Sequence, residues 1–167
     1  IADDSERYLV VAAPRAGCIW SGRALLGDIK KKFGILILHD TDSSFVITHE
    51  LGHALGLGHS NFLSCEDKAK DGPWGSNCKA VEYGGTIDPM GNLDTRSSFS
   101  TYHQWRMGFM DDSQIKQVWQ SEVVNLAPSD FANGIKAIFV RDGQAGYWIE
   151  YRRKTDGVAY KPGLAIY

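Results

Sequence analysis

The sequence predicts an α+β fold, with a sheet and helices in its first part and a smaller β region after them. Two short apolar runs, Tyr8–Ala13 and Ile35–Leu38, are typical of buried strands. A capped segment with apolar residues at helical spacing, Phe45–Leu55, ends at a glycine. Beyond residue 111, strand-like runs alternate with Gly and Pro turns, so we expect the architecture to change there.

The remaining elements of the first part are less regular. Cys18–Leu26 is mixed in polarity and is a second strand candidate; a helix over Arg23–Phe33 is the competing interpretation. The N-terminus of the helix at 45–55 is predicted by the capping residues Asp42, Ser43 and Ser44, and its end by Gly56 and Gly58. Residues 60–98 are expected to be irregular, and so long an irregular stretch is uncommon unless it is functional.

In the second part we expect a helix over Phe99–Met107, capped by Ser97, Ser98 or Ser100 and ended by Gly108. Asp112 and Ser113 are expected to cap a short helix that runs through Val118. Strands are predicted at Glu122–Leu126, Lys136–Arg141, Tyr147–Arg152 and Leu164–Tyr167. The chain is therefore predicted to consist of two regions, residues 1–110 and 111–167.

Composition excludes several classes of protein. Eighteen Lys and Arg residues against twenty Asp and Glu residues give a net charge of −2, so no bulk charge favours nucleic acid or an anionic membrane. No apolar run approaches the roughly 20 residues that a membrane span needs. Five Trp, seven Tyr and seven Phe residues argue against disorder. The chain begins at Ile1 and ends on a strand-like run, which suggests a processed or partial chain.

The three cysteines are Cys18, Cys65 and Cys78, and an odd number leaves at least one without an intrachain partner. Cys65 and Cys78 flank a loop rich in Asp, Lys, Gly and Pro, which favours a disulfide and an oxidising compartment. The alternative is two free thiols in a reducing cytosol. We expect a secreted, extracellular protein.

The segment from His49 to His59 carries the chemistry. His49 and His53 are four residues apart, so both imidazoles lie on one helix face and can share one ion. Gly56 lets the backbone leave the helix sharply, so that His59 returns as a third ligand. Three neutral imidazoles with an open position are typical of catalytic zinc, and Glu50 can act as general base on a metal-activated water. The alternative is a helix with incidental surface histidines.

This eleven-residue pattern resembles the metzincin clan of zinc endopeptidases. The clan also places a methionine turn beneath the metal, and Asp88–Gly91, which contains Met90, is the candidate here. Further blocks are similar to gametolysin-type metallopeptidases and their bacterial relatives: Glu82–Gly85, Asp88–Asn92, Phe99–Gly108, Tyr147–Arg152 and Gly163–Tyr167. The resemblance spans residues 8–167.

The resemblance implies a metzincin-like core of twisted sheet, active-site helix, Met-turn and C-terminal helix, followed by a small β region. The strand and long helix with which such domains begin have no room before Tyr8, so that part of the core is expected to be absent. Ile19–Leu26 resembles the edge strand on which an extended protein or peptide substrate binds, or is an ordinary strand. Met90 is expected to support the site, and Tyr102 to stabilise the oxyanion or to be simply a packed tyrosine.

The other candidates are weaker. His39 and His103 lack the spacing of the zinc motif and are interpreted as non-ligands. Calcium has no motif to support it, although acidic residues are present at Glu66, Asp67, Asp71, Asp88 and Asp94. We therefore expect a zinc endopeptidase acting on proteins such as matrix or cell-wall glycoproteins. An inactive fragment or binding module that keeps the site is the alternative, as is a zinc hydrolase of a non-peptide amide.

Overall fold

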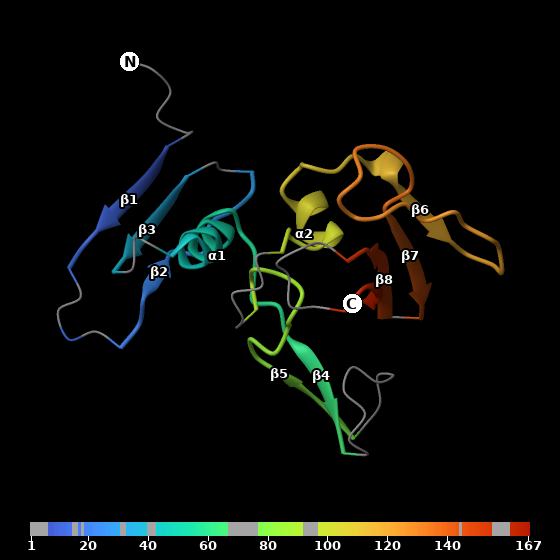
Figure 1. The fold of residues 1–167 in the computed structure, drawn as a ribbon, viewed down its shortest axis with the longest axis horizontal. Helices are drawn as coiled ribbons and strands as arrows, with labels where there is room; N and C mark the ends of the chain where they lie inside the picture. Colours follow the sequence, from blue (N-terminus) through green and yellow to red (C-terminus); the bar gives the residue numbers. More distant parts are fainter. Residues whose placement is uncertain are drawn as a thin grey trace. The chain divides into compact units, whose positions relative to one another are not determined.

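The computed structural model describes residues 7–14, 17, 19–30, 33–39, 43–66, 77–91, 97–143, 145–154 and 161–167. The chain divides into two compact units, residues 1–96 and 97–167 (Figure 1). Strands dominate the described part and helices are few, which confirms the α+β prediction. The functional division into residues 1–110 and 111–167 stays a prediction. No described helix has both the length and the apolar character that crossing a membrane requires.

The first unit is built on a three-stranded sheet in the order β1-β3-β2. The central strand β3 (Gly34–Leu38) pairs in parallel with β1 (Tyr8–Ala12) and antiparallel with β2 (Gly22–Ala24). The predicted strand Cys18–Leu26 is thus shorter than expected, and Cys18 lies outside the described residues. The competing helix over 23–33 is wrong for every described residue in that range. β2 lies at the edge of the sheet.

Helix α1 (Ser44–Ala54) packs on β2 and β3, beside which Figure 1 shows it. Ser43 caps it, because the Ser43 hydroxyl accepts a hydrogen bond from a backbone N–H three residues ahead. The core of the unit includes Leu36, Leu38 and Ala54, which are buried. Gly34 lets the helix approach closely, since a Cβ at this position would lie 2.6 Å from Cβ of Ala54. The close contact fixes α1 on the sheet.

The second unit carries α2 (Thr101–Arg106), capped by Ser100, and a four-stranded sheet in the order β6-β7-β8-β9. The strands are β6 (Ile115–Val118), β7 (Ala137–Asp142), β8 (Ala145–Arg152) and β9 (Gly163–Ile166). The predicted helix near 99–107 and the last three predicted strands are confirmed within a few residues.

Two predictions for this unit are wrong. The expected helix from Asp112 is only a 3-10 turn, Asp112–Gln114, and the chain then continues as β6. Ile115 and Val118 are β-branched, and pairing with β7 overrides the capping signal that precedes them. The expected strand Glu122–Leu126 forms only one bridge, from Leu126 to Ile135. Val123 is 96% exposed, so no sheet neighbour packs on the middle of that segment.

A buried polar network joins the helix and strands of the second unit. One carboxylate oxygen of Glu150 accepts hydrogen bonds from the backbone N–H and the hydroxyl of Thr101, both at 2.5 Å. The other oxygen accepts from Arg152 and from the hydroxyl of Tyr167. Glu150 and Arg152 are almost fully buried. Removing either side chain would leave the charge of the other buried without a partner of opposite charge, which is strongly destabilising. The network ties α2 to β8 and to the residue after β9.

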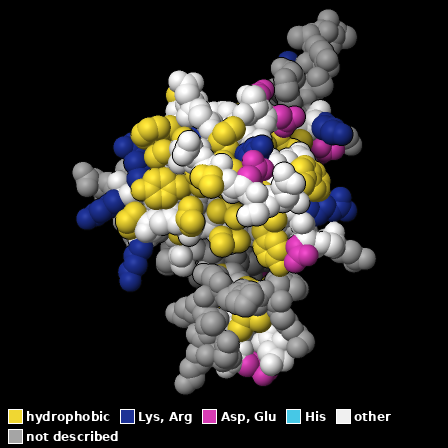
Figure 2. Space-filling view, turned by 90° about the vertical axis from the view of Figure 1, so that its right-hand side faces the viewer, with side chains coloured by type: hydrophobic (Ala, Val, Ile, Leu, Met, Phe, Trp, Pro, Cys, Tyr) yellow, Lys and Arg dark blue, Asp and Glu magenta, His cyan; other side chains and the backbone are white. Residues whose placement is uncertain are grey.

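Hydrophobic side chains also remain at the surface. In the second unit Met110, Ala137 and Trp148 form a small buried core, while Phe109 and Trp119 are each 70% exposed. Figure 2 shows one face of the molecule on which hydrophobic side chains gather, with Lys and Arg side chains around them. The described elements therefore leave apolar surface uncovered.

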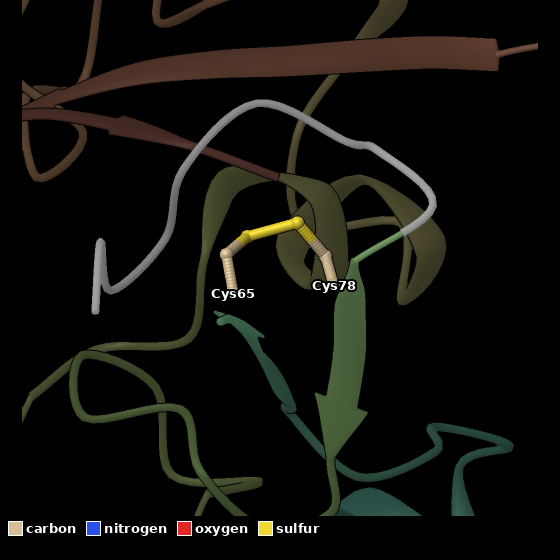
Figure 3. The surroundings of a disulfide bond; sticks show 2 residues. All are labelled: Cys65 and Cys78. Carbon is tan, nitrogen blue, oxygen red and sulfur yellow. A yellow bond between two sulfur atoms is a disulfide. The ribbon is translucent and has the colours of Figure 1, made fainter. Parts of the chain in front are cut away.

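The first unit also contains a β-hairpin that the sequence analysis missed. β4 (Phe62–Cys65) pairs antiparallel with β5 (Cys78–Val81) inside the stretch 60–98 that was expected to be irregular. Each strand is only four residues long, too short for a pattern of alternating polarity to stand out. Cys65 and Cys78 lie directly opposite each other and form a disulfide, which confirms the predicted pairing (Figure 3).

We predict that neither Cys65 nor Cys78 reacts with an alkylating reagent in the folded, unreduced protein. Reduction should lower the free energy of unfolding by about 3 kcal/mol, because the bond closes a loop of about 15 residues in the unfolded chain. Mass spectrometry after alkylation and chemical denaturation with and without reductant measure the two effects. A double Cys65→Ser, Cys78→Ser variant, whose stability should not respond to reductant, is the control. Modification of both thiols without reductant would contradict the prediction.

Candidate metal centre

Three histidines converge in the first unit. The potential ligand atoms of His49, His53 and His59 all lie within 4.8 Å of one another. His49 and His53 are on α1, one turn apart, and His59 follows the end of the helix. Among the described residues no other three His, Cys, Asp or Glu side chains gather in this way. The structure thus brings together the three residues that the spacing predicts as ligands.

The end of α1 explains how His59 reaches the other two. Gly56 has a φ of 86°, in the left-handed region that glycine adopts readily. Its N–H donates to the carbonyl of His53 (2.9 Å), and the N–H of Leu57 donates to the carbonyl of Gly52 (3.0 Å). These two bonds form a Schellman motif, which ends the helix and reverses the chain. Gly56 therefore has the role that the sequence analysis expects.

Each imidazole is oriented through its Nδ1 atom. In all three the Nδ1 atom lies 2.8 Å from an oxygen acceptor. Because a carbonyl or carboxylate oxygen only accepts, Nδ1 must carry the proton, and the lone pair on Nε2 is left for a metal. The acceptors of His49, His53 and His59 are, in order, the carbonyl oxygens of Pro89 and Leu57 and a carboxylate oxygen of Glu82.

The electrostatics also suit a metal. Burial lowers the pKa of both His49 and His53, and hydrogen bonds to backbone carbonyls oppose this shift. Both rings are therefore neutral at pH 7, the form that binds a metal. Three imidazoles whose Nδ1 atoms are held by hydrogen bonds, so that Nε2 can bind a metal, are a donor set that fits zinc.

The turn Asp88–Gly91 lies against this cluster. Met90 is fully buried, and its N–H donates to the side chain of Asp88 (2.8 Å). The carbonyl of Met90 accepts from the N–H of Ser60, the residue after His59 (2.8 Å). The carbonyl of Pro89, in the same turn, accepts a hydrogen bond from His49. The turn therefore bonds directly to His49 and to the residue that follows His59. The role of Met90 as a Met-turn that supports the site stays a prediction.

Gly52 makes room for that methionine. A Cβ at Gly52 would lie 2.3 Å from the sulfur of Met90, much closer than any real Cβ contact. Met90 thus packs directly on the helix turn between His49 and His53. The sequence analysis did not single out Gly52; a glycine inside a helix, where it is unfavourable, was the available signal.

Glu50 is on α1, and its side chain lies against the edge strand β2. Its side chain is buried, and a Cβ at Gly22 of β2 would lie 2.8 Å from one of its carboxylate oxygens. Burial raises the pKa of the Glu50 carboxyl, and the positive charge of Arg23 opposes this shift. Gly22 therefore allows the carboxylate to sit against the backbone of β2, a contact that no sequence pattern indicated.

These groups line one open cleft. Its volume is about 560 Å³, within the usual range for ligand pockets. The lining comes from the edge strand β2 and the residue that follows it, from β3, from α1 and from the end of the hairpin: Gly22, Arg23, Ala24, Leu25, Ile35, Ile37, His49, Glu50, His53 and Tyr83. His49, His53 and the candidate base Glu50 therefore line the same cleft as the edge strand β2.

Other predicted residues lie elsewhere. Tyr102 belongs to the second unit, where its ring packs against His103, Trp105 and Trp148, and its role at the oxyanion stays a prediction. The Nδ1 atom of His39 is 3.1 Å from two backbone carbonyl oxygens, and His39 is not part of the metal-binding group. Asp88 is fully buried in its turn, and Glu66 does not join the group either. Asp67, Asp71 and Asp94 lie outside the described residues.

A comparison with protein families supports this interpretation. The model of a family described as "Dual-action HEIGH metallo-peptidase" matches residues 30–93, less than half of the chain. The matched segment contains α1, all three histidines and Met90. No significant match was found among curated proteins or among solved structures. The chain is therefore similar to a metallopeptidase family over the segment that carries the candidate metal centre.

We predict that Gly52→Ala destabilises the protein, although alanine in a helix interior normally gains about 0.8–1.0 kcal/mol over glycine. The added Cβ would overlap the buried sulfur of Met90, and overpacking of this kind costs about 1–3 kcal/mol. Thermal unfolding at fixed zinc concentration measures the difference. Gly58→Ala is the matched control, because a Cβ at Gly58 meets nothing within 4 Å. A higher melting temperature for Gly52→Ala would show that Met90 does not pack as described.

We predict that the chain binds one zinc ion, and that His59→Ala lowers its zinc content in the presence of a modest chelator. Burial keeps His49 and His53 neutral below the usual imidazole pKa of about 6.5, so zinc should stay bound at that pH and leave below about pH 5–6. Metal analysis after dialysis at a series of pH values measures both effects. Unchanged zinc content in His59→Ala would remove His59 from the site.

Proposed function

We propose that this protein is a zinc endopeptidase that hydrolyses peptide bonds in proteins. The observation that carries the proposal is the position of Glu50, whose carboxylate faces the same cleft as His49 and His53 and lies against the edge strand. The match to a metallopeptidase family supports the class of reaction. A zinc ion held by the three histidines would polarise the scissile carbonyl and lower the pKa of a water molecule to about 7.

Glu50 is the proposed general base. Its carboxylate would accept a proton from the attacking water and then donate it to the leaving amine. Burial supports this role, because a raised pKa moves the carboxyl closer to the neutral pH at which one group can both accept and donate. Glu50 must be ionised to start the reaction, so activity should decline as the pH falls through its raised pKa.

The edge strand β2 is the proposed binding surface for an extended substrate. β2 pairs with β3 on one side only, and its residues line the cleft. A peptide could add to such an edge by backbone hydrogen bonds, which tolerates many side chains. Gly22 and Ala24 support the proposal, because both line the cleft with Glu50, and Gly22 has no side chain while Ala24 has only a methyl group to obstruct a peptide.

The proposal extends to a secreted enzyme of the gametolysin type that acts on matrix or cell-wall glycoproteins. The Cys65–Cys78 disulfide supports an oxidising compartment. The sequence blocks that resemble gametolysin-type enzymes lie in both units, and the buried Glu150–Arg152 pair of the second unit belongs to one of them.

We predict that Glu50→Gln keeps zinc but loses peptidase activity by about 10²–10⁴-fold, the usual contribution of a general base. The amide has nearly the same shape, and no ligand is removed, so zinc content should stay at the wild-type level. Hydrolysis of a quenched fluorescent peptide and zinc stoichiometry are measured on the same preparation. Glu66→Gln, which removes an equal charge from the exposed residue after β4, is the control and should remain active.

The outcomes separate the alternatives. Full zinc and near-normal activity in Glu50→Gln would assign the proton transfer to another group. A wild-type protein that binds zinc but cleaves no protein or peptide, while it hydrolyses another amide, would be a zinc hydrolase of a different substrate class. Zinc binding with no hydrolysis of either would favour an inactive fragment or a binding module.

A further inference from the structure

His59 is held differently from the other two histidines. It does not lie on α1, and its side chain keeps 20% of its surface exposed. Its Nδ1 atom donates to a carboxylate, Glu82, whereas His49 and His53 donate to neutral backbone carbonyls. Because the helix does not fix His59, the residues around its ring must position it.

Tyr83 packs on the face of the same ring. The two ring centroids are 3.6 Å apart with an angle of 35° between the planes. Glu82 therefore contacts the edge of the His59 ring while Tyr83 covers one face. The Tyr83 ring also stacks at 5.9 Å from His49 and lines the cleft, so it lies at the metal centre itself.

The backbone of Tyr83, whose ring contacts His59, has an uncommon conformation. Tyr83 has a φ of 59°, and among the described residues no other non-glycine residue has a positive φ. Such a conformation is unfavourable for a bulky side chain and persists only where its surroundings enforce it. The N–H of Tyr83 donates to the side chain of Asn61 (3.1 Å), and the N–H of Gly84 donates to the carbonyl of Val81 (3.1 Å).

The end of the hairpin is packed on the segment that follows His59. A Cβ at Gly84 would lie 1.9 Å from the ring of Phe62, and a Cβ at Gly85 would lie 2.8 Å from Ser60. The N–H of Gly85 also donates to the carbonyl of Ser60 (2.9 Å). Close contacts along residues 60–62 thus fix the hairpin end, and with it Glu82 and Tyr83, relative to His59.

We propose that Glu82 and Tyr83 form a clamp on His59 and are positioning residues that set the affinity of the site for zinc. This inference rests on the proposed zinc site. The Glu82 carboxylate fixes the tautomer of His59. It also makes Nε2 more basic and therefore a stronger metal ligand, as carboxylates behind metal-bound histidines do. The Tyr83 ring limits rotation of the imidazole, so less conformational freedom is lost when the metal binds.

The test measures zinc affinity by competition with a chelator at neutral pH, using the full chain. Glu82→Ala should lower zinc affinity by about 10–100-fold. Glu82→Gln should fall between the wild type and Glu82→Ala, because its amide oxygen still accepts from Nδ1 but lacks the charge. Tyr83→Ala should weaken binding, while Tyr83→Phe, which keeps the ring, should bind zinc as the wild type does.

Glu66→Gln is the matched control. Glu66 follows β4 at the disulfide end of the same hairpin, so the variant removes one charge far from His59 and should leave zinc affinity unchanged. Circular dichroism and thermal unfolding of the metal-free variants check that the fold is retained. If Glu82→Ala does not fold, the comparison of Glu82→Gln with Glu66→Gln decides the role of Glu82.

Equal zinc affinities of Glu82→Gln, Glu82→Ala and Glu66→Gln would overturn the role of Glu82. Equal losses in Tyr83→Phe and Tyr83→Ala would overturn the role of the ring. The proposed function fails in a distinguishable way: the wild type binds zinc and the clamp variants weaken it, but no peptide is cleaved. A wild type that binds no zinc would overturn both.

Discussion

The left-handed turn at Gly56 is the constraint on which the candidate centre depends. A right-handed continuation of α1 would carry His59 along the helix axis, away from His49 and His53. The positive φ at Gly56 instead allows the Schellman hydrogen bonds that end the helix. The chain then turns back towards the helix face that carries His49 and His53. The same turn presents the carbonyl of Leu57 to His53, so one backbone conformation both brings the third imidazole in and orients the second.

The three histidines are oriented by segments far apart in the chain. The acceptors are at residues 57, 82 and 89, in the helix exit, at the end of the hairpin and in the turn Asp88–Gly91. The hairpin end and this turn also form backbone hydrogen bonds with Ser60, next to His59. Forming the nitrogen cluster therefore requires that all three segments fold together. Zinc binding would stabilise the folded first unit as a whole rather than one loop.

The sequence could predict what depends on local spacing and could not predict what depends on packing between distant segments. The ligand spacing, the Ser43 cap and the glycine exit are local, and the structure has the cap and exit where they were expected. The hairpin β4–β5 was missed because its strands are four residues long. A local sequence pattern also could not indicate the roles of Glu82, Tyr83 and Gly22, because these residues act through contacts with residues 20 or more positions away. Met90 was found only through the resemblance to a family.

X-ray absorption at the zinc edge of the purified chain tests the central claim most directly. Coordination by His49, His53 and His59 predicts nitrogen and oxygen neighbours at about 2.0–2.1 Å, with the outer scattering pattern of three imidazole rings. Cys65 and Cys78 should contribute no sulfur neighbour, since they are joined to each other. A sulfur neighbour at about 2.3 Å, or the scattering of fewer than three imidazoles, would contradict the three-histidine centre.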